Sequence, residues 1–382
     1  MKLALFYHSI VSDWNNGNAH FLRGIVDGLR SRGHKVSVYE PVNGWSRVNL
    51  VQGHGSRPLQ EFKSIFPGIE SIEYDQDAIA LETALEGMDV VIVHEWNDEA
   101  LIRRIGRLRA AGGRFRLLFH DTHHRCYFAP RFLDAVELFN YDGVLAFGAV
   151  LTEFYRSGAW TPRAWTWHEA ADTRIFKPCP APQYSGDLVW VGNWGDDERK
   201  EEIACYLLEP TRALGLRTTI FGVRYPAPAL EALQAAGVRY AGWLPNYRVP
   251  ETFGAFRLTV HIPRRPYLRE LRGIPTIRPF EALACGIPLI IPLWEDTENL
   301  FTAGQDYLPA SDPQAMKNCM RAVLNEPDLA ESLVRHGRST VLARHTCAHR
   351  VDELLAICAG MDATAVRQAP AARGGIETAG RP

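Results

Sequence analysis

The chain has 382 residues, and at about 150 residues per domain this length predicts two or three domains. Hydrophobic residues make up 46% and charged residues 23%, a mixture typical of a globular protein with an apolar core. The formal net charge is only −2, which argues against a protein whose whole surface binds nucleic acid or an anionic membrane.

Hydropathy and cysteine usage exclude further classes of protein. The longest bulky apolar run, 287–294, is far shorter than the ~20 residues of a membrane span and is interrupted by Pro288 and Pro292. The N-terminal residues become polar too early for a signal peptide. The seven cysteines are scattered and form no CxxC pair, as expected for reduced thiols. We therefore expect a cytoplasmic protein without a membrane span.

The first half of the chain alternates strands with helices. A helix is expected from Asn18, because Leu22, Ile25, Val26 and Leu29 form one apolar face. Continuous apolar strands separated by helices indicate a parallel sheet that is covered on both faces. The expected strands are 2–7, 35–39, 71–74, 89–95, 114–120 and 142–147.

A second unit of the same kind follows a proline-rich linker between Pro162 and Pro182. Its expected strands are 187–191, 217–221, 239–243, 258–262 and 288–292, followed by a mostly helical segment to Ile357. The predicted fold class is therefore α/β, with two doubly wound Rossmann-like domains that face each other across a cleft. The expected ranges are 1–170 for the first domain, 171–360 for the second domain and 361–382 for a disordered tail.

The segment 276–290 carries the clearest local signal. Pro279 suits the first turn of a helix that Gly286 ends, and this places Glu281 in the first turn at the open edge of the sheet. A carboxylate there accepts hydrogen bonds from sugar hydroxyls, while the free N–H groups of the helix face an anion. Alternatively, Glu281 only complements the helix dipole.

These motifs resemble those of GT-B glycosyltransferases. The sequence RPFEALACGIP at 278–288 is similar to their C-terminal signature, and VGNWGDDERK at 191–200 resembles the start of that domain in the CgeB-like (spore-protein-like) group. GWLP at 242–245 and AGQDYL at 303–308 follow in the same order. The resemblance implies a nucleoside-diphosphate sugar as co-substrate, with Glu281 on its ribose and Asn193 and Phe280 on the donor side. It also implies that residues 1–170 form the acceptor-binding domain and residues 171–360 the nucleotide-sugar-binding domain. Gly273 stands where many retaining members carry a second glutamate.

Basic residues concentrate beside this motif. Arginine forks bind phosphate oxygens in pairs and would stabilise a leaving diphosphate. The alternatives are a solvated loop whose arginines pair with surface acids, or a site for an acidic acceptor; nucleic acid is disfavoured because few aromatic residues are interleaved. The basic residues are Arg264, Arg265, Arg269, Arg272 and Arg278, together with Arg199 and Lys200 at the start of the domain's first helix.

Polar residues follow the strands of the first half, where a doubly wound sheet presents its ligand-binding groups. We expect His120 and Asp121 to act as the acid/base or positioning pair for the acceptor. Further base candidates are His94 with Glu95 and His168 with Glu169. Asn16 and Gly17 are expected at the cleft, or simply as part of a helix cap.

Metal and cofactor motifs are weak. His120 and His123 lack an evident third ligand, and Asp75 and Asp77 spell DxD at a strand–helix junction, where Asp77 suits a helix cap. GxGxxG is absent after the first strand, which argues against a dinucleotide oxidoreductase. We therefore expect neither a metal site nor a resident cofactor.

Together these patterns predict a metal-independent glycosyltransferase of the hexosyltransferase type. It would move a sugar from a nucleoside-diphosphate sugar to an acceptor that the motifs do not identify. Two alternatives stay open: a nucleotide-sugar epimerase of the same architecture, and a non-catalytic nucleotide- or carbohydrate-binding protein.

Overall fold

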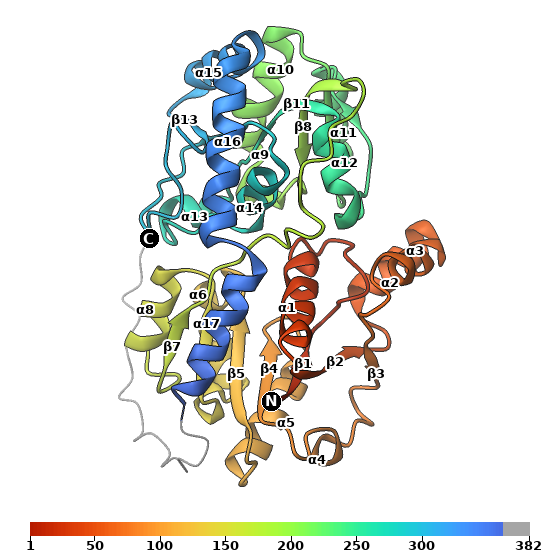
Figure 1. The fold of residues 1–382 in the computed structure, drawn as a ribbon, viewed down its shortest axis with the longest axis vertical. Coiled ribbons are helices and arrows are strands. Elements are labelled where there is room, and N and C mark those ends of the chain that lie inside the picture. The colour runs from red at the N-terminus through yellow and green to blue at the C-terminus, as the bar shows by residue number, and fades with distance from the viewer. Residues whose placement is uncertain (362–382) are drawn as a thin grey trace.

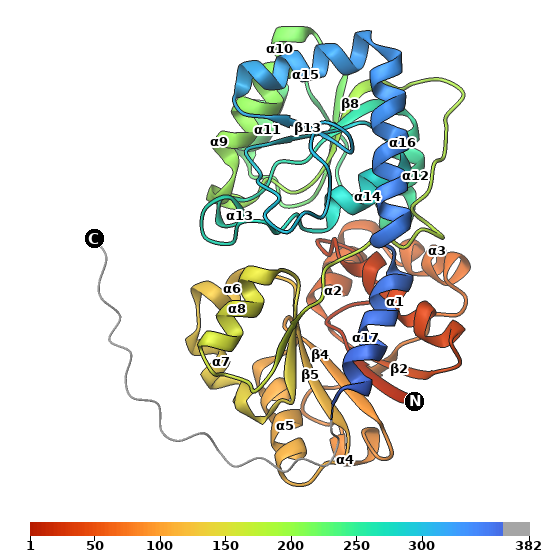
Figure 2. The same ribbon diagram turned by 60° about the vertical axis from the view of Figure 1, so that its left-hand side comes forward.

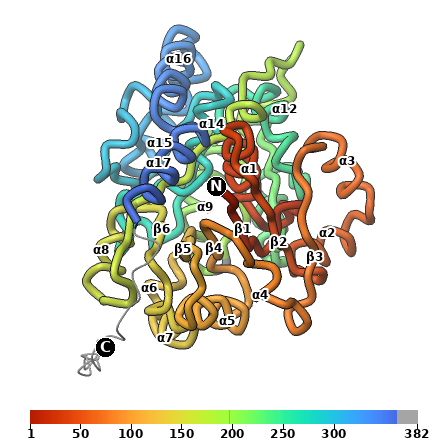
Figure 3. Tube along the Cα trace, turned by 60° about the horizontal axis from the view of Figure 1, so that its bottom comes forward, coloured from red at the N-terminus to blue at the C-terminus, as the bar shows by residue number. Residues whose placement is uncertain are grey.

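The computed structural model describes residues 1–361, which form two α/β domains stacked along the long axis of the molecule (Figure 1). The described part of the first domain contains a parallel sheet in the order β3-β2-β1-β4-β5-β6-β7. Figure 3 shows β6, β5, β4, β1, β2 and β3 in this order across the domain. Its strands are β1 (Lys2–Phe6), β2 (Lys35–Pro41), β3 (Ile72–Tyr74), β4 (Val90–His94), β5 (Arg116–Asp121), β6 (Gly143–Ala146) and β7 (Ala164–Thr166).

Helices cover both faces of this sheet. Alternate strand residues point to opposite faces, so each face carries its own apolar layer for the helices to pack on. On β1, Ala4 and Phe6 belong to one apolar layer, and Leu3 and Leu5 belong to the other. The face predicted for the first helix packs as expected, since Leu22, Ile25, Val26 and Leu29 are fully buried. The helices are α1 (Ala19–Ser31), α2 (Trp45–His54), α3 (Arg57–Ile65), α4 (Leu81–Ala84), α5 (Glu99–Ala110), α6 (Arg125–Phe128), α7 (Arg131–Ala135), η1 (Leu138–Asn140) and α8 (Ala149–Ser157).

The second domain repeats the same winding, with the parallel order β10-β9-β8-β11-β12-β13 among the described residues. Its strands are β8 (Gly186–Val191), β9 (Thr218–Phe221), β10 (Arg239–Tyr240), β11 (Phe256–Val260), β12 (Leu289–Pro292) and β13 (Leu308–Ala310). Its helices are η2 (Asp196–Glu198), α9 (Lys200–Ile203), η3 (Ala204–Leu208), α10 (Glu209–Leu214), α11 (Ala227–Ala235), η4 (Asn246–Arg248), α12 (Val249–Gly254), α13 (Arg265–Arg269), α14 (Ile277–Cys285), α15 (Pro313–Asn325) and α16 (Pro327–Arg344). The prediction of two doubly wound domains is confirmed.

The chain crosses between the domains a second time after α16. Helix α17 (Cys347–Ala359), inside the range expected for the second domain, returns to the first domain and packs on α1 (Figures 1 and 2). The two crossings lie side by side, because Ala171 N–H donates to His345 O (3.1 Å) and Cys347 N–H donates to Ala171 O (3.0 Å). Met361 is buried in the same core, and the rest of the predicted tail, 362–382, lies outside the described residues.

Several short elements differ from the sequence prediction. Strand β7 lies inside the expected linker, β13 lies in a segment expected to be helical, and α2 and α3 were not predicted. Asp77 caps no helix: α4 begins at Leu81, and the Asp77 N–H instead donates to Asp75 Oδ1 (2.9 Å). No helix within residues 1–361 combines the length and the apolar character needed to cross a bilayer.

Candidate functional site

A cavity of about 1010 Å³ lies between the two domains, at the carboxyl ends of their strands. His8 and His94 reach it from the ends of β1 and β4, the strands between which the order of the first sheet reverses. Gly192 and His261 reach it from β8 and β11, where the second sheet reverses. Doubly wound proteins bind their ligands at such switch points. The cavity is therefore the candidate active site.

The two walls of this cavity carry opposite charges. Among the described residues, the second domain contributes Arg199, Arg224, Arg264 and Arg278 to the lining, with the acid Glu198. The first domain contributes Asp13, Asp75, Asp77, Asp98 and Glu169, without any lysine or arginine in the described lining. An anion is therefore attracted to the wall formed by the second domain.

Arg199 is the most deeply placed cation of that wall. Its guanidinium donates to Ile262 O (3.2 Å) and Asn193 O (2.5 Å) and lies over the Trp190 ring, 5.1 Å from the centroid. Within the described residues its buried Nε has no hydrogen-bond partner. Burial, with added repulsion from Arg264 and Arg278, lowers the pKa of Arg199 to about 9. A bound dianion would offset both the burial and the repulsion of this cation.

The other two predicted arginines that line the cavity already have acidic partners. Arg264 donates to Glu198 (2.5 Å), and Glu198 also contacts His124 Nε2 of the first domain at 3.0 Å. Arg278 pairs with Glu281 on the same helix. Part of the positive charge of this wall is therefore compensated internally.

The remaining predicted donor residues do not line the cavity. Lys200 pairs with Asp197 at 2.7 Å, and Arg265 pairs with Glu202 at 2.7 Å. Arg272 is exposed, and its nearest acid is Glu295 at 4.0 Å. For these three residues the structure favours the alternative of a surface loop paired with acids. Asn193 does line the cavity, and its side chain donates to Asn15 of the opposite domain.

Glu281 lies behind the cavity and needs a correction. Helix α14 begins at Ile277, two residues earlier than expected, so Glu281 lies in its second turn, and it is fully buried. Its carboxylate lies 2.9 Å from His20 Nδ1 and accepts from Arg278, which reaches the cavity in its place. Phe280 is also buried and packs against Phe301 and His345.

Gly273 stands where a second glutamate was considered, and its backbone explains the absence of a side chain. It has φ +90°, a conformation that side chains rarely adopt. A Cβ atom there would collide with Thr297 Oγ1. This loop therefore leaves no room for a glutamate at position 273.

The expectation that His120 and Asp121 face the acceptor also needs correction. Both are fully buried, and neither lines the cavity. Burial lowers the pKa of His120 to about 3, so the ring is neutral. Asp121 accepts from Tyr155 Oη (2.6 Å) and from the His123 N–H (3.2 Å). The two residues end β5 and support the wall from behind.

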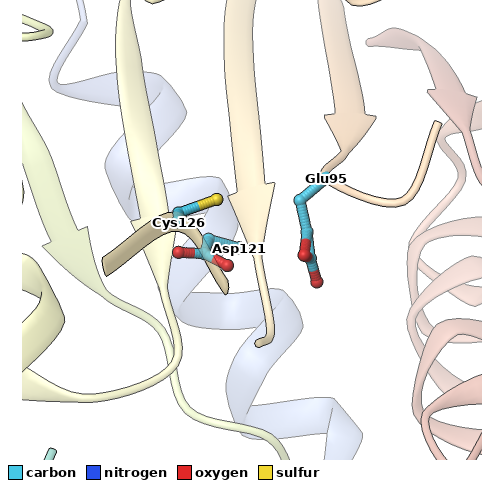
Figure 4. Close-up of side chains that lie close together, drawn as sticks. All are labelled: Glu95, Asp121 and Cys126. Carbon is cyan, nitrogen blue, oxygen red and sulfur yellow. The ribbon is translucent and has the colours of Figure 1, made fainter. Parts of the chain in front are cut away.

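Among residues 1–361, one group of side chains has the spacing of a metal site: Glu95, Asp121 and Cys126 (Figure 4). The Arg125 Nε lies 3.9 Å from Glu95 Oε2, so a cation already occupies the neighbourhood. Burial and the proximity of Asp121 raise the pKa of Glu95, and burial raises that of Asp121. None of the three lines the cavity, so a metal held here would not touch a ligand in it.

The loop after β1 lies at the cavity, as predicted. Asn16 and Gly17 line the cavity, and both backbone oxygens accept from Asn246 Nδ2 of the second domain (3.4 and 3.2 Å). His94 also lines it, and its ring nitrogens contact Thr122 Oγ1 (3.2 Å) and the Trp96 N–H (3.3 Å).

Besides Arg199 Nε, five buried polar atoms of lining residues have no hydrogen-bond partner among the described residues: His8 Nδ1, Asp13 Oδ1, Glu169 Oε2, Trp243 Nε1 and His261 Nε2. Burial lowers the pKa of His8 to about 4 and that of His261 to about 3, so both rings are neutral. Burial raises the pKa of Glu169 well above its usual range. Of His8, Glu169 and His261, only Glu169 was a candidate from the sequence; the signal for the two histidines was their position after an apolar strand.

The sequence of the second domain matches a known family. Residues 199–356 match the model of a family described as "Glycosyl transferase-like". This match covers less than half of the chain but includes the arginine wall and α14. No curated protein matches the chain by sequence.

Solved structures resemble the chain along almost its whole length. A sucrose-phosphate synthase from Thermosynechococcus elongatus has 15% sequence identity and a TM-score of 0.63, covering 94% of this chain and 98% of its own. HepE from Anabaena, in complex with UDP and glucose, has 14% identity, a TM-score of 0.67 and coverage of 94% and 100%. An α-glucosyltransferase in complex with UDP and DNA has 12% identity, the same TM-score and coverage of 94% and 100%. The chain therefore has the GT-B glycosyltransferase fold, as its motifs predicted.

Proposed function

We propose that the protein is a glycosyltransferase that moves a sugar from a nucleoside-diphosphate sugar to an acceptor hydroxyl. The observation that carries this proposal is the convergence of Arg199, Arg264 and Arg278 on the cavity, at the switch point of the second domain. The family match to 199–356 supports it. Because HepE and the α-glucosyltransferase are in complexes with UDP, a UDP-linked hexose is the first donor to test.

In this proposal the diphosphate lies against the arginine wall. Arg199 offers its unpartnered Nε, and Arg278 reaches the cavity while Glu281 holds its guanidinium. Asn193 and Arg199 belong to the VGN…R segment, which is the basis for placing the chain near the CgeB-like group. The arginines supply the positive charge that the leaving group needs, so we propose transfer without a metal ion.

Transfer forms a bond between the acceptor oxygen and the anomeric carbon, and it breaks the bond from that carbon to the phosphate oxygen. The nucleoside diphosphate leaves with the bonding electrons, and the acceptor hydroxyl gives up its proton. We propose His8 as the proton acceptor, because its ring is neutral at pH 7 and lines the cavity with an unpartnered Nδ1. His120 and Asp121 then act as positioning residues behind this wall.

We further propose that the protein works in the cytoplasm. Its seven cysteines are all free thiols, and four of them are buried in the cores, as expected in a reducing compartment.

Product analysis tests the proposed function. The protein is incubated with UDP-hexoses in the presence and absence of a panel of acceptors, and UDP and the sugar are quantified. We expect release of UDP that depends on the acceptor, together with a glycosylated product. Isomerisation of the sugar without acceptor would instead identify an epimerase, and tight nucleotide binding without any turnover would identify a binding protein.

A further inference from the structure

The cavity has a second half that the nucleotide does not explain. We propose that the first-domain wall is an acceptor subsite for an uncharged carbohydrate, and that it repels polyanionic acceptors. This inference rests on the proposed function, because it assigns the acceptor of the same site. We call this wall the acceptor wall and define it by Asp13, Asp75, Asp77, Asp98, Trp45 and Trp96.

The rim of the acceptor wall carries three carboxylates and one neighbouring guanidinium, because Arg104 donates to Gln76 O (2.8 Å) and Ile79 O (2.9 Å) of the loop that holds Asp75 and Asp77. Asp75, Asp77 and Asp98 are exposed, and their described contacts are with backbone N–H groups of their own loops. The three carboxylates lie after β3 and β4, on the side of the cavity opposite the arginines. A chain of phosphates or sulfates on this wall would meet like charges.

The histidines of the wall do not reverse this charge. Burial is the main cause that lowers the pKa of His8 to about 4 and that of His123 to about 3, and it lowers the pKa of His94 as well. All three rings are therefore neutral at pH 7. Arg125, on the next helix, lies under Trp96 and beside Glu95 and does not line the cavity.

Two tryptophans of the wall expose large apolar surfaces to the cavity. The exposed fractions of Trp45 and Trp96 are 54% and 42%. The Trp45 ring packs against the edge of Trp14, with centroids 4.9 Å apart, and the Arg224 guanidinium of the second domain lies 6.0 Å from its centroid. The Trp96 ring packs on Arg125, whose guanidinium lies 4.5 Å from its centroid. Rigid aromatic rings with a free face suit the apolar C–H face of a sugar ring, and exposed apolar surface of this kind marks a binding site.

An unpartnered acceptor atom independently indicates a ligand with donor groups. Asp13 is only 6% exposed and lines the cavity. Its Oδ2 accepts from Arg23 and from the Asn246 N–H, each at 3.1 Å, whereas its buried Oδ1 has no partner among the described residues. Buried carboxylate oxygens are almost always hydrogen-bonded, so a hydroxyl of the bound molecule is the expected donor.

These features together select the chemical class. Aromatic faces and carboxylate acceptors match a molecule with apolar ring faces and many hydroxyls. The negative wall disfavours nucleic acids and sulfated or phosphorylated glycans. The inferred acceptor is therefore the end of a neutral oligosaccharide.

The test is calorimetric titration with UDP present. The uncharged probes are maltotetraose, cellotetraose and mannotetraose; the polyanionic probes are a heparin tetrasaccharide and a short single-stranded DNA. We expect the dissociation constant of an uncharged probe to be at least about tenfold lower than that of either polyanion. The ratio of the two constants should increase at low salt, because repulsion between like charges is then less screened. Tighter binding of a polyanion, or no binding by any uncharged probe, would overturn the inference.

Variants locate the subsite. Trp96→Ala should weaken binding of the uncharged probe by about tenfold, as expected for the loss of an aromatic contact, while UDP affinity stays the same. The Asp75→Asn, Asp77→Asn double variant should bring the dissociation constants of the uncharged and polyanionic probes closer together, because it removes two negative charges from the wall. Tyr184→Ala serves as the control, because it removes a ring that is 53% exposed and lies outside the cavity. It should change neither the affinity for the uncharged probe nor the preference for that probe over the polyanions.

The affinity for UDP is measured separately from the affinity for the glycan probes. Failure of UDP to bind contradicts the proposed function, whereas normal UDP binding with unchanged glycan affinity in Trp96→Ala contradicts only this inference. Circular dichroism of each variant confirms that a loss of affinity is not a loss of fold.

Discussion

His8 and His120 are both neutral histidines of the first domain, but only His8 lines the cavity. His8→Asn should therefore lower kcat by about 10²- to 10⁴-fold, the usual contribution of a general base, and leave donor affinity unchanged. His120→Asn should keep kcat within a few-fold of wild type. Steady-state kinetics and a pH profile of both variants check this. Equal losses in the two variants would contradict the role assigned to His8.

Glu169 makes the stability of the protein depend on pH. Burial, with repulsion from Glu281 and Glu95, raises its pKa in the folded state, so the stability it contributes is present at low pH and lost as the pH rises through that pKa. Glu169→Gln removes this loss. The free energy of unfolding of the Glu169→Gln variant, taken relative to wild type, should therefore increase between about pH 5 and about pH 8. Urea unfolding at both pH values measures the difference; a constant difference would contradict this role of Glu169.

Sequence patterns identified candidate donor-binding residues along the chain but not the direction in which their side chains point. Arg199, Arg278 and Asn193 were predicted and do line the cavity, whereas Lys200, Arg265 and Arg272 pair with acids outside it. The difference depends on which way a side chain points from a short helix, and this depends on packing that one sequence does not reveal. Glu281 shows the same limit, because the sequence placed it in the first turn of a helix but did not reveal that packing buries it behind the cavity.

At the scale of elements, the contact between α1 and α17 joins the last described helix to the first domain. A Cβ on Gly24 would lie 2.5 Å from Cys347 Sγ, and one on Gly28 would lie 2.9 Å from Val351 Cγ2. Gly24→Ala and Gly28→Ala should each destabilise the protein by about 1–3 kcal/mol, the usual cost of overpacking.

A third glycine provides the control for this prediction. Gly53 is helical and exposed, and a Cβ added to it would meet no neighbouring atom within 4 Å, so Gly53→Ala should stabilise the protein by up to about 1 kcal/mol. Denaturant midpoints of the three variants give the comparison. If all three shift in the same direction, the close packing of α17 on α1 is not the cause.

Elements with strong apolar patterns were predicted well, and short or exposed ones were not. Strands such as β1 and β4 are continuous apolar runs, and α1 has a clear apolar face. Helix α2 buries only Ser46 and Leu50, so its sequence carries no apolar periodicity to detect. Strands β7 and β13 have three residues each and exist because they pair with β6 and β12.

At the scale of the whole molecule, charge is divided between the two walls of the cavity. The arginine cluster was visible in the sequence because its members are close together, but the acceptor wall was not, since Asp13, Asp75 and Asp98 come from three separate loops. A near-neutral net charge therefore conceals two opposite local fields.

The arginine wall also leads to a prediction about metal ions. If arginines supply the charge for the leaving diphosphate, as we propose, turnover should be unchanged after treatment with EDTA. The assay compares UDP release before and after chelation and after addition of Mg²⁺ or Mn²⁺. Loss of activity with EDTA that either ion restores would contradict metal-independent transfer.

The most direct test of the central claim is the affinity of UDP for the arginine wall. Calorimetry should show binding to the wild-type protein and a loss of about 10- to 100-fold in Arg199→Gln, as expected when a charge-assisted hydrogen bond of about 1.5–3 kcal/mol is removed. Arg272→Gln, an exposed arginine outside the cavity, should bind UDP like wild type. Equal UDP affinity in all three proteins would contradict the assignment of this wall as the donor site.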